Sequence, residues 1–483
     1  MTDERGDAKK GKVMQSLVGM DAAFLALETP TTPMHVGVAL VLDPPEGTRS
    51  LFSPSTRYAQ IRRVIQQRLH LIAPLRQRAL RMPFGLHHPV WVDDPEFDLD
   101  DHLSRASLPS PGGRAELDAF VAGVMSRQLD PDRPLWEMHV VEGLEGERTA
   151  LVAKVHHAVA DGAATVALLL SAFGARGPDS PVEVWRPEAI PTKPQLLRLA
   201  ARAHVTRLRQ LPRLATRSLR GLRESEVRRR ASPVRPPLPF DTPKTPFNVS
   251  LTGQRTYAMT TLALEDLKAV RRAHGATLND VFLTVCGGAV RTYLIETGAL
   301  PTRPLVACVP VSTDPSTTRL GGNRVDNWYV SIGTDIADPL ERLQTIREVA
   351  AAAKAVRSLL GNDLLERRAD IVPPQLYALV VRTWARTGLA NHTRPPVNLV
   401  LSNVPGPRER LHIGQAVLEA IYSVGPILEG IGLNITAWSY ADDLNVSVLG
   451  CPTSVPDPWL ITDALQRSMS DIKEASDRSA RTG

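Results

Sequence analysis

The chain has 483 residues, of which 43% are hydrophobic and 22% are charged, and its formal net charge is +6 at pH 7. This length exceeds what one hydrophobic core usually supports, so we expect two domains, and the hydrophobic fraction excludes a globally disordered chain. The basic balance is compatible with nucleic acid, anionic lipid or a phosphorylated small molecule as a partner, and the position of the basic residues matters more than their number.

The cysteines and the N-terminus indicate where the chain works. Cys286, Cys308 and Cys451 lie far apart and form no CxxC pair. We therefore expect no disulfide framework and a reducing compartment, the cytoplasm. The charged segment 1–12 has no apolar core of a signal peptide, and no run of about 18 uninterrupted apolar residues occurs, so any membrane contact is expected to be peripheral.

The first part of the chain alternates between strand-like and helix-like stretches. A valine-rich run over 34–42 predicts a buried strand, and helical periodicity predicts helices over 57–71 and 116–129. A hairpin follows, with strands over 136–142 and 149–156 and a glycine-containing turn over 143–147. After a turn at Asp161-Gly162, the apolar run 163–173 predicts another helix.

Alternation along the second strand of this hairpin separates two adjacent histidines. One face carries Leu151, Ala153, Val155 and His157, and the other carries Val152, Lys154 and His156. Because successive strand residues point to opposite faces, the two histidines cannot have the same role. One is expected to enter a cleft while the other packs into its own domain.

Residues 186–248 differ in composition, because prolines flank a stretch rich in arginine and leucine. Residues 196–222 have helical spacing, with leucines and arginines on different stripes. Two interpretations stay open: a solvated helix that packs on one domain, or a helix on an anionic membrane or lipid-droplet surface. Nucleic-acid binding is the weakest alternative, because aromatic residues are scarce here and no nucleic-acid module accompanies the arginines.

A second unit is expected from residue 249 onward. Its predicted helices cover 265–274, 278–296 and 460–475, the second capped near Thr277 or Asn279. Its predicted strands cover 304–312, 328–332, 397–401 and 444–449. The sequence thus predicts an α/β protein with domains at 1–185 and 249–483, joined by a basic linker at 186–248.

The histidine segment His156-His157-Ala158-Val159-Ala160-Asp161-Gly162 carries the candidate chemistry. A histidine can remove the proton of an alcohol because its pKa lies near neutral pH. Asp161 can shape the loop by pairing with an arginine, or it can orient the imidazole of His157, and the residues alone do not separate these roles. No HExxH, GxSxG, Walker A or GxGxxG motif is present, so neither a metal site nor serine-hydrolase or nucleotide-loop chemistry is supported.

Several motifs occur in an order that resembles one family. HHxxxDG resembles the active-site motif of CoA-dependent acyltransferases of the chloramphenicol acetyltransferase type. Pro134-Leu135-Trp136 and Asn279-Asp280 resemble the PLW and ND motifs of the bacterial wax ester synthase/diacylglycerol acyltransferase family. Further similarity to this family lies at 19–25, 309–312, 322–323 and 402–407. Phe282 and Thr284 depart from the smaller aliphatic residues that usually follow the ND motif, which leaves the length of the substrate chain open.

This resemblance implies two chloramphenicol acetyltransferase-like mixed-sheet domains with an active-site tunnel between them. It implies an O-acyltransferase that moves a long-chain acyl group from acyl-CoA, as co-substrate, to diacylglycerol or a long-chain alcohol, without a bound cofactor. The implied location is the cytoplasm, with peripheral association with a membrane or lipid droplets. The alternatives are acyl transfer to another lipid or polyketide alcohol, and a catalytically silent lipid-droplet binder.

The resemblance also implies roles for single residues. His157 is the implied base, beside His156, and Asp161 is chiefly structural. Asn279 is a candidate for stabilising the reaction intermediate, with a helix cap as its alternative role. Ser402 or Asn403 is expected to line the cleft, with a simple turn as the alternative.

Overall fold

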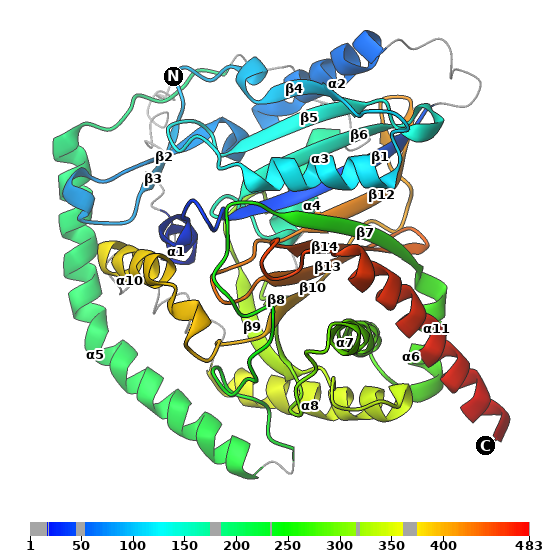
Figure 1. The fold of residues 1–483 in the computed structure, drawn as a ribbon. Helices are drawn as coiled ribbons and strands as arrows, with labels where there is room; N and C mark the ends of the chain where they lie inside the picture. The colour runs from blue at the N-terminus through cyan, green and yellow to red at the C-terminus, as the bar shows by residue number, and fades with distance from the viewer. Residues whose placement is uncertain are drawn as a thin grey trace, which may run out of the picture.

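The computed structural model describes residues 17, 19–44, 54–173, 185–231, 234–314, 319–360 and 374–482. The charged segment 1–12 lies outside these residues. Within them the chain forms two six-stranded mixed sheets, covered by helices, and a small two-stranded sheet (Figure 1). The expected α/β architecture with two mixed sheets is confirmed.

The first sheet has the order β11-β12-β1-β6-β5-β4. Its pairs are antiparallel except for β4 and β5, which run parallel. One face packs on helix α3, and the other packs on α2 and α4, so both faces are buried. The bounds of these elements are β1 His35–Asp43, α2 Pro54–Arg68, β4 Leu103–Ser107, α3 Arg114–Ser126, β5 Trp136–Glu142, β6 Thr149–His156, α4 Gly162–Phe173, β11 His412–Ile413 and β12 Ala416–Val424.

The second sheet has the order β7-β14-β13-β10-β8-β9, and its central strand β10 runs parallel to both neighbours. Helices α6, α7, α8 and α11 pack together around its largest apolar core. The bounds are β7 Thr256–Ala263, α6 Leu264–His274, α7 Leu278–Glu296, β8 Val306–Ser312, β9 Val325–Ser331, α8 Pro339–Leu360, β10 Leu399–Pro405, β13 Leu433–Tyr440, β14 Asp443–Gly450 and α11 Trp459–Thr482.

The C-terminal part of the chain completes the N-terminal sheet. Strand β12 pairs antiparallel with β1, so that Tyr422 lies opposite Ala39, and β11 extends the sheet beyond it. The next strand, β13, then belongs to the second sheet. The chain therefore crosses the boundary that we predicted at residue 249, because backbone pairing joins segments that lie almost 400 positions apart.

The remaining helices gather on one side of the molecule. Helix α5 (Lys193–Ala231) runs along the outside, past α10 (Pro374–Thr387), which contacts α1 (Gly19–Leu27) (Figure 1). The N-terminal turns of α5 bury Leu196 and Ala200 against the hairpin of β2 (Gln77–Leu80) and β3 (Val90–Asp93). The predicted helix over 196–222 is confirmed, and it is longer than expected at both ends.

Most predicted elements are present, and the hairpin over 136–156 has the predicted bounds. The faces of β6 also agree, because Leu151 packs in the core beneath α2 and α4, whereas Val152 packs in the core beneath α3. Elements that sequence periodicity did not reveal are α1, α8, α10, β2, β3, β4, β7, β11, β12 and β13.

Candidate active site

His157 follows the last residue of β6 and is held by its backbone and its ring. Its amide donates to the carbonyl oxygen of Met34 at 2.7 Å. Its half-buried imidazole stacks on Phe24 of α1, with ring centroids 4.0 Å apart and an angle of 18° between the rings. The histidine therefore lies between the first sheet and α1, with little freedom to change its rotamer.

Asn323, which lies between β8 and β9, meets the imidazole from the C-terminal part of the chain. The Nδ1 atom of His157 lies 3.0 Å from Oδ1 of Asn323. The Nδ2 atom of Asn323 donates to the carbonyl oxygen of His157 at 2.7 Å and to Oδ1 of Asp21 at 2.8 Å. Because Nδ2 of Asn323 faces these two acceptors, Oδ1 of Asn323 faces the imidazole. Oδ1 can only accept a hydrogen bond, so Nδ1 of His157 must carry a proton and donate it to Oδ1.

The tautomer of His157 follows from this arrangement. A neutral imidazole with its proton on Nδ1 has its lone pair on Nε2, which is the nitrogen that can accept a proton. Burial lowers the pKa of His157 below its ordinary value of 6.5, although its own backbone, Asp161 and Asn323 oppose this shift. The ring is therefore neutral at neutral pH, which is the form that a general base requires.

Asp21 of α1 lies behind Asn323. Its Oδ1 atom accepts hydrogen bonds from both the backbone amide and the side-chain amide of Asn323, at 3.0 and 2.8 Å. The Asp21 side chain is only 2% exposed, and burial raises its pKa to about 7 despite these hydrogen bonds. A buried carboxyl group thus fixes the residue that contacts the imidazole.

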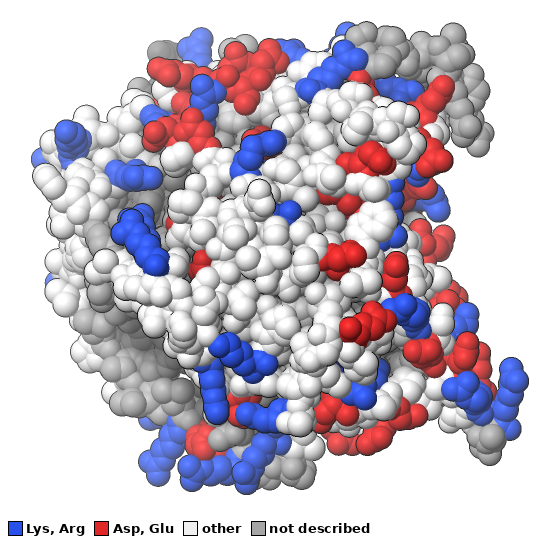
Figure 2. Space-filling model, in the orientation of Figure 1, with Lys and Arg blue, Asp and Glu red and all other residues white. Residues whose placement is uncertain are grey.

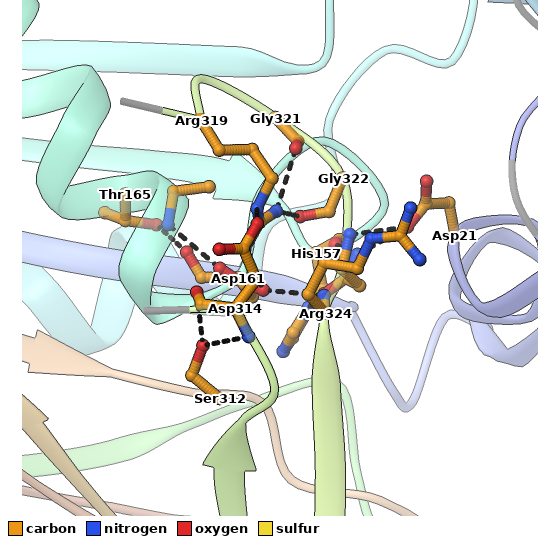
Figure 3. Close-up of polar contacts among 12 residues, drawn as sticks. Asp21, His157, Asp161, Thr165, Ser312, Asp314, Arg319, Gly321, Gly322 and Arg324 are labelled. Atoms are coloured by element: carbon orange, nitrogen blue, oxygen red, sulfur yellow. Dashed lines mark hydrogen bonds and ion pairs between the residues drawn. The ribbon is translucent and has the colours of Figure 1, made fainter. Parts of the chain in front are cut away.

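Asp161 does not contact His157 among the described hydrogen bonds. Its Oδ2 atom lies 2.6 Å from Nη2 of Arg319 and accepts the backbone amide of Arg324 at 2.8 Å (Figure 3). Its Oδ1 atom accepts the amide of Ala164 at 2.9 Å and so caps the first turn of α4. This geometry supports the loop-shaping role that we assigned to Asp161.

The loop 319–324 is attached to the histidine segment along its backbone as well. The amide of Gly322 donates to the carbonyl oxygen of Val159 at 2.7 Å, and Ala160 and Gly322 form a parallel bridge. Arg319 also donates to the carbonyl oxygens of Gly321 and Gly322 (Figure 3). These contacts bring Asn323 to the ring of His157.

Gly162, the last residue of the motif, is needed for close packing. A Cβ atom at this position would lie 3.1 Å from Cγ2 of Val404 in β10, which is tighter than ordinary van der Waals contact. Its φ is not in the left-handed region. The sharp turn that we expected from this glycine is therefore less important than the approach of β10 to the start of α4.

His156 points away from His157 into a buried polar cluster. Its Nδ1 atom accepts the amide of Ala158 at 3.0 Å, and its Nε2 atom lies 3.5 Å from Glu28. Glu28 also lies 3.3 Å from Nε2 of His35. Burial raises the pKa of Glu28, but the hydrogen bonds of the two histidines outweigh it and hold that pKa well below its usual range. The opposite orientations predicted for the two histidines are confirmed.

The face of β6 that carries His156 also buries Lys154. Its Nζ atom donates to the carbonyl oxygens of Val124 and Arg127 at the end of α3 and lies 3.2 Å from Glu137. A cation at a helix C-terminus is favoured by the orphan carbonyls and the helix dipole. Lys154 therefore ties α3 to the strand that ends at the candidate base.

A pocket of about 270 Å³ opens beside this arrangement. It lies between the N-terminal part of the chain and the loop 319–324, and its lining includes Asp21, Trp91, Val159, Arg319 and Asn323. The pocket thus reaches the residues that hold His157. Its continuation into the tunnel that we expected through the molecule stays a prediction.

The other predicted site residues lie on the second sheet and its helices. Asn279 is half-buried in the first turn of α7, and it makes no described hydrogen bond to the histidine segment. The cap of α7 is Thr277, which exchanges two hydrogen bonds with Asp280, so Asn279 is not the cap. The proposed role of Asn279 in stabilising the intermediate stays a prediction.

Ser402 and Asn403 lie within β10, where they pair with Thr436 and Ala437. The alternative of a simple turn at these residues is therefore wrong. Because the next residue, Val404, reaches Gly162, this strand does run toward the histidine segment. Their contact with a bound substrate stays a prediction.

Asp21, Phe24 and Arg319 were not predicted as site residues. Asp21 and Phe24 lie in the segment 19–25, and Asn323 lies in the pair 322–323, both of which resemble the family without indicating a role. The described residues contain no group of three or more potential metal ligands. No described helix is both long and apolar enough to cross a membrane.

Comparison with solved structures defines the class of this fold. The first condensation domain of the CDA synthetase superposes with a TM-score of 0.55 at 18% identity, over 97% of each chain. The wax ester synthase/diacylglycerol acyltransferase from Marinobacter aquaeolei VT8 superposes with a TM-score of 0.67 at 28% identity, over 96% of this chain and 100% of that chain. The two-sheet fold is thus that of condensation domains and CoA-dependent acyltransferases.

Sequence comparison gives the family. Residues 17–282 match the wax ester synthase/diacylglycerol acyltransferase catalytic domain, and residues 321–473 match the C-terminal domain of the same family. A Mycobacterium tuberculosis protein, provisionally named a diacylglycerol O-acyltransferase, is 40% identical over 96% of this chain and 97% of its own length. Another protein of that organism with the same provisional name is 35% identical. The chain belongs to the wax ester synthase/diacylglycerol acyltransferase family and is an O-acyltransferase.

Proposed function

We propose that the chain transfers a long-chain acyl group from acyl-CoA to the hydroxyl group of diacylglycerol, with His157 as the general base. The observation that carries this proposal is the hydrogen bond from Nδ1 of His157 to Asn323, because it leaves Nε2 unprotonated. The pocket lined by Asp21 and Asn323 lies beside the residues that hold the base, and His157 itself is not among the lining residues.

The reaction needs no covalent intermediate. Nε2 of His157 takes the proton of the acceptor hydroxyl, and the oxygen forms a bond to the carbonyl carbon of the thioester. The carbon–sulfur bond then breaks, and the imidazolium returns its proton to the CoA thiolate. Positioned general-base action contributes about 10²–10⁴-fold. The remaining acceleration comes from orientation of the two substrates and from stabilisation of the oxyanion.

His157→Ala tests the base. Purified wild type and variant are incubated with radiolabelled palmitoyl-CoA and diacylglycerol, and triacylglycerol is measured. We expect a loss of at least about 10²-fold in kcat with an unchanged unfolding midpoint. His412→Ala, which changes an exposed histidine on β11, is the matched control and keeps full turnover. Wild-type turnover in His157→Ala contradicts the assignment, and an acyl-protein adduct contradicts direct transfer.

The acceptor is tested in the same assay. Diacylglycerol is the proposed acceptor, and a long-chain alcohol, which gives a wax ester, is the second candidate. Parallel reactions with diacylglycerol, hexadecanol and a polyketide-like alcohol give three values of kcat/KM. A higher value for either alcohol than for diacylglycerol contradicts the proposed acceptor. Absence of product with every alcohol favours a silent binder of lipid droplets.

We also propose that α5 and its neighbours attach the protein to an anionic lipid surface. Helix α5 is rich in arginine, and its only acidic residues are Glu224 and Glu226. Where this side of the molecule is coloured in Figure 2, basic side chains lie toward its upper and lower ends. Past the buried first turns, Val205 and Leu208 of this helix are exposed to solvent.

The loop between β2 and β3 adds an aromatic residue to this side. Phe84 is 87% exposed and has a φ of 54°, a left-handed conformation that is unfavourable for a bulky residue. The loop is held against α5 by a 2.6 Å contact between Nε2 of His204 and the carbonyl oxygen of Leu86. Apolar side chains beside arginines fit a membrane interface, where the rings enter the lipid and the cations face phosphate groups.

Liposome flotation tests this attachment. Vesicles of phosphatidylcholine, with and without phosphatidylglycerol, are mixed with wild type, with Phe84→Ser/Leu208→Ser, and with a control. The control is Leu460→Ser, an exposed residue in the first turn of α11, a helix that lies apart from α5 (Figure 1). We expect at least about tenfold weaker binding of the double variant to anionic vesicles, because two apolar groups are lost. Equal binding by all three proteins contradicts the proposal.

A further inference from the structure

We propose that Asp21 is a positioning residue for the reaction: through Asn323, it determines which nitrogen of His157 carries the proton. This inference rests on His157 as the general base. Asp21 reaches the imidazole only through the asparagine, with hydrogen bonds from Asn323 Nδ2 to Asp21 Oδ1 at 2.8 Å and from His157 Nδ1 to Asn323 Oδ1 at 3.0 Å.

An asparagine alone does not select a tautomer, because its oxygen and nitrogen ends are similar in shape. If its amide group turned over, Nδ2 would donate to Nδ1 and leave the proton on Nε2, which would remove the base. Asp21 prevents this, since its oxygen and the carbonyl oxygen of His157 both accept from Nδ2. An amide oxygen facing these two acceptors would lose two buried hydrogen bonds and leave the two acceptor oxygens unpaired.

The location of Asp21 supports a functional role. Its carboxyl group is buried beside Arg319 and Asp161, and it accepts the backbone amide of Asn323 in addition to the side chain. A carboxyl group in such a place opposes stability, because its ionised form is separated from water. A residue that served packing alone would not need a carboxyl group there. The carboxyl oxygen does fit as the acceptor that orients the amide group of Asn323.

The hydrogen bonds that connect Asp21, Asn323 and His157, called the relay below, also join the two parts of the chain. Asp21 and His157 belong to the N-terminal part, whereas Asn323 comes from the loop that Arg319 holds against Asp161. The tautomer of the base is therefore set only when this loop is in place. This gives the aspartate of the HHxxxDG motif an indirect part in the reaction, because it holds the loop that carries Asn323.

Five variants test the relay: Asn323→Ala, Asp21→Ala, Asp21→Asn, Asp21→Asn/Asn323→Asp and Asn398→Ala. The last is the matched control, because the buried Asn398 also accepts one hydrogen bond and donates two, but in a different part of the molecule. For each variant we measure kcat, the KM for acyl-CoA, the pH dependence of kcat/KM and the unfolding midpoint.

Asn323→Ala is expected to lower kcat about 10²-fold, with little change in KM, because the ring loses its fixed tautomer. Asp21→Ala is expected to lower kcat about tenfold or more, whereas Asp21→Asn keeps most of it, because the amide oxygen still accepts both hydrogen bonds. In Asp21→Asn/Asn323→Asp a carboxylate meets Nδ1 directly. This carboxylate stabilises the imidazolium form of His157. The acid limb of kcat/KM, which is the pH range where the rate falls because the base becomes protonated, then moves upward by about one pH unit.

Three results overturn the inference. The first is a loss of kcat in Asn323→Ala no greater than that in Asn398→Ala. The second is equal activity of Asp21→Ala and wild type, or equal losses in Asp21→Ala and Asp21→Asn. The third is an acid limb that stays in place in the double variant, as expected for a merely structural role. The proposed function itself fails in a different way, namely by turnover in His157→Ala.

Discussion

Asp161 and Arg319 form an ion pair that joins two segments of the chain, with 2.6 Å between Oδ2 and Nη2. Asp161 is 1% exposed, and Arg319 comes from the loop that also supplies Asn323. The aspartate of the histidine motif therefore faces the loop and not the imidazole. This relationship supports the loop-shaping role of Asp161 over direct orientation of His157.

A double-mutant cycle tests this role. Arg319→Gln should destabilise the protein by about 3–5 kcal/mol, because it leaves the buried Asp161 carboxylate without its cation. Asp161→Asn should destabilise it less, because Arg319 is 17% exposed and also lies 3.6 Å from Asp314. The double variant should be little worse than Arg319→Gln, in urea unfolding and in kcat alike. If Asp161 instead oriented His157 directly, Arg319→Gln would retain activity and the effects on kcat would add.

The pH dependence of kcat/KM should reflect the pKa of the half-buried imidazole of His157. Burial lowers the pKa of His157 below 6.5, so the neutral base persists as the pH falls below that value. We therefore expect the acid limb of kcat/KM to lie below pH 6.5 in the wild type. Initial rates at subsaturating acyl-CoA, at each pH where the protein remains folded, locate the limb. A limb above pH 6.5 contradicts this account of the base.

Asp118 of α3 predicts a pH-dependent change in stability. It is buried 3.7 Å from Arg114, and burial raises its pKa to about 8 from an ordinary value of 3.8. The folded state therefore favours the protonated carboxyl group, and this contribution to stability is lost progressively as the pH rises from 3.8 to about 8.

Asp118→Asn retains the shape of the side chain without the charge. The variant should unfold at nearly the wild-type temperature close to pH 3.8, and it should become more stable than the wild type as the pH rises, by on the order of 2 kcal/mol at alkaline pH. Thermal unfolding of both proteins across pH gives this difference directly, because all other titrating groups cancel. A difference that does not change with pH contradicts the raised pKa.

Variants of Asn279 and Thr277 distinguish a role of Asn279 in the reaction from a role in capping helix α7. Thr277→Ala should lower stability by about 1 kcal/mol, because it removes the side-chain oxygen that accepts the amide of Asp280. Asn279→Ala should leave stability within about 0.5 kcal/mol, since its side chain is not the cap. If Asn279 stabilises the intermediate, kcat falls in this variant alone. Unchanged kcat in Asn279→Ala rules that role out.

The local features of the site were predictable because they depend on periodicity. Alternation along β6 separated His156 from His157, and the structure gives these histidines different surroundings, a buried polar cluster and the contact with Asn323. The histidine, the turn at Asp161 and the apolar helix that follows are encoded within about 20 residues. Backbone geometry alone fixes how such neighbours are oriented.

Strand order was not predictable in the same way. The sequence of strand β12 is a short mixture of apolar and polar residues. Only its pairing with β1 shows that residues 416–424 belong to the first sheet. The domain boundary drawn from composition therefore separated strands that share hydrogen bonds. Composition changes along the chain, but sheet pairing depends on which edges meet when the cores form.

By itself the sequence determined the identity of the candidate base, the mixed α/β class and the side of the strand on which His157 lies. Only the tertiary structure decided what fixes the proton of that base. Asn323 and Asp21 lie 166 residues after and 136 residues before His157 in the sequence, and their contacts exist only once α1 and the loop 319–324 have packed against β6. A hydrogen bond requires atoms within about 3 Å, and for residues this far apart in the chain that proximity is a property of the folded core.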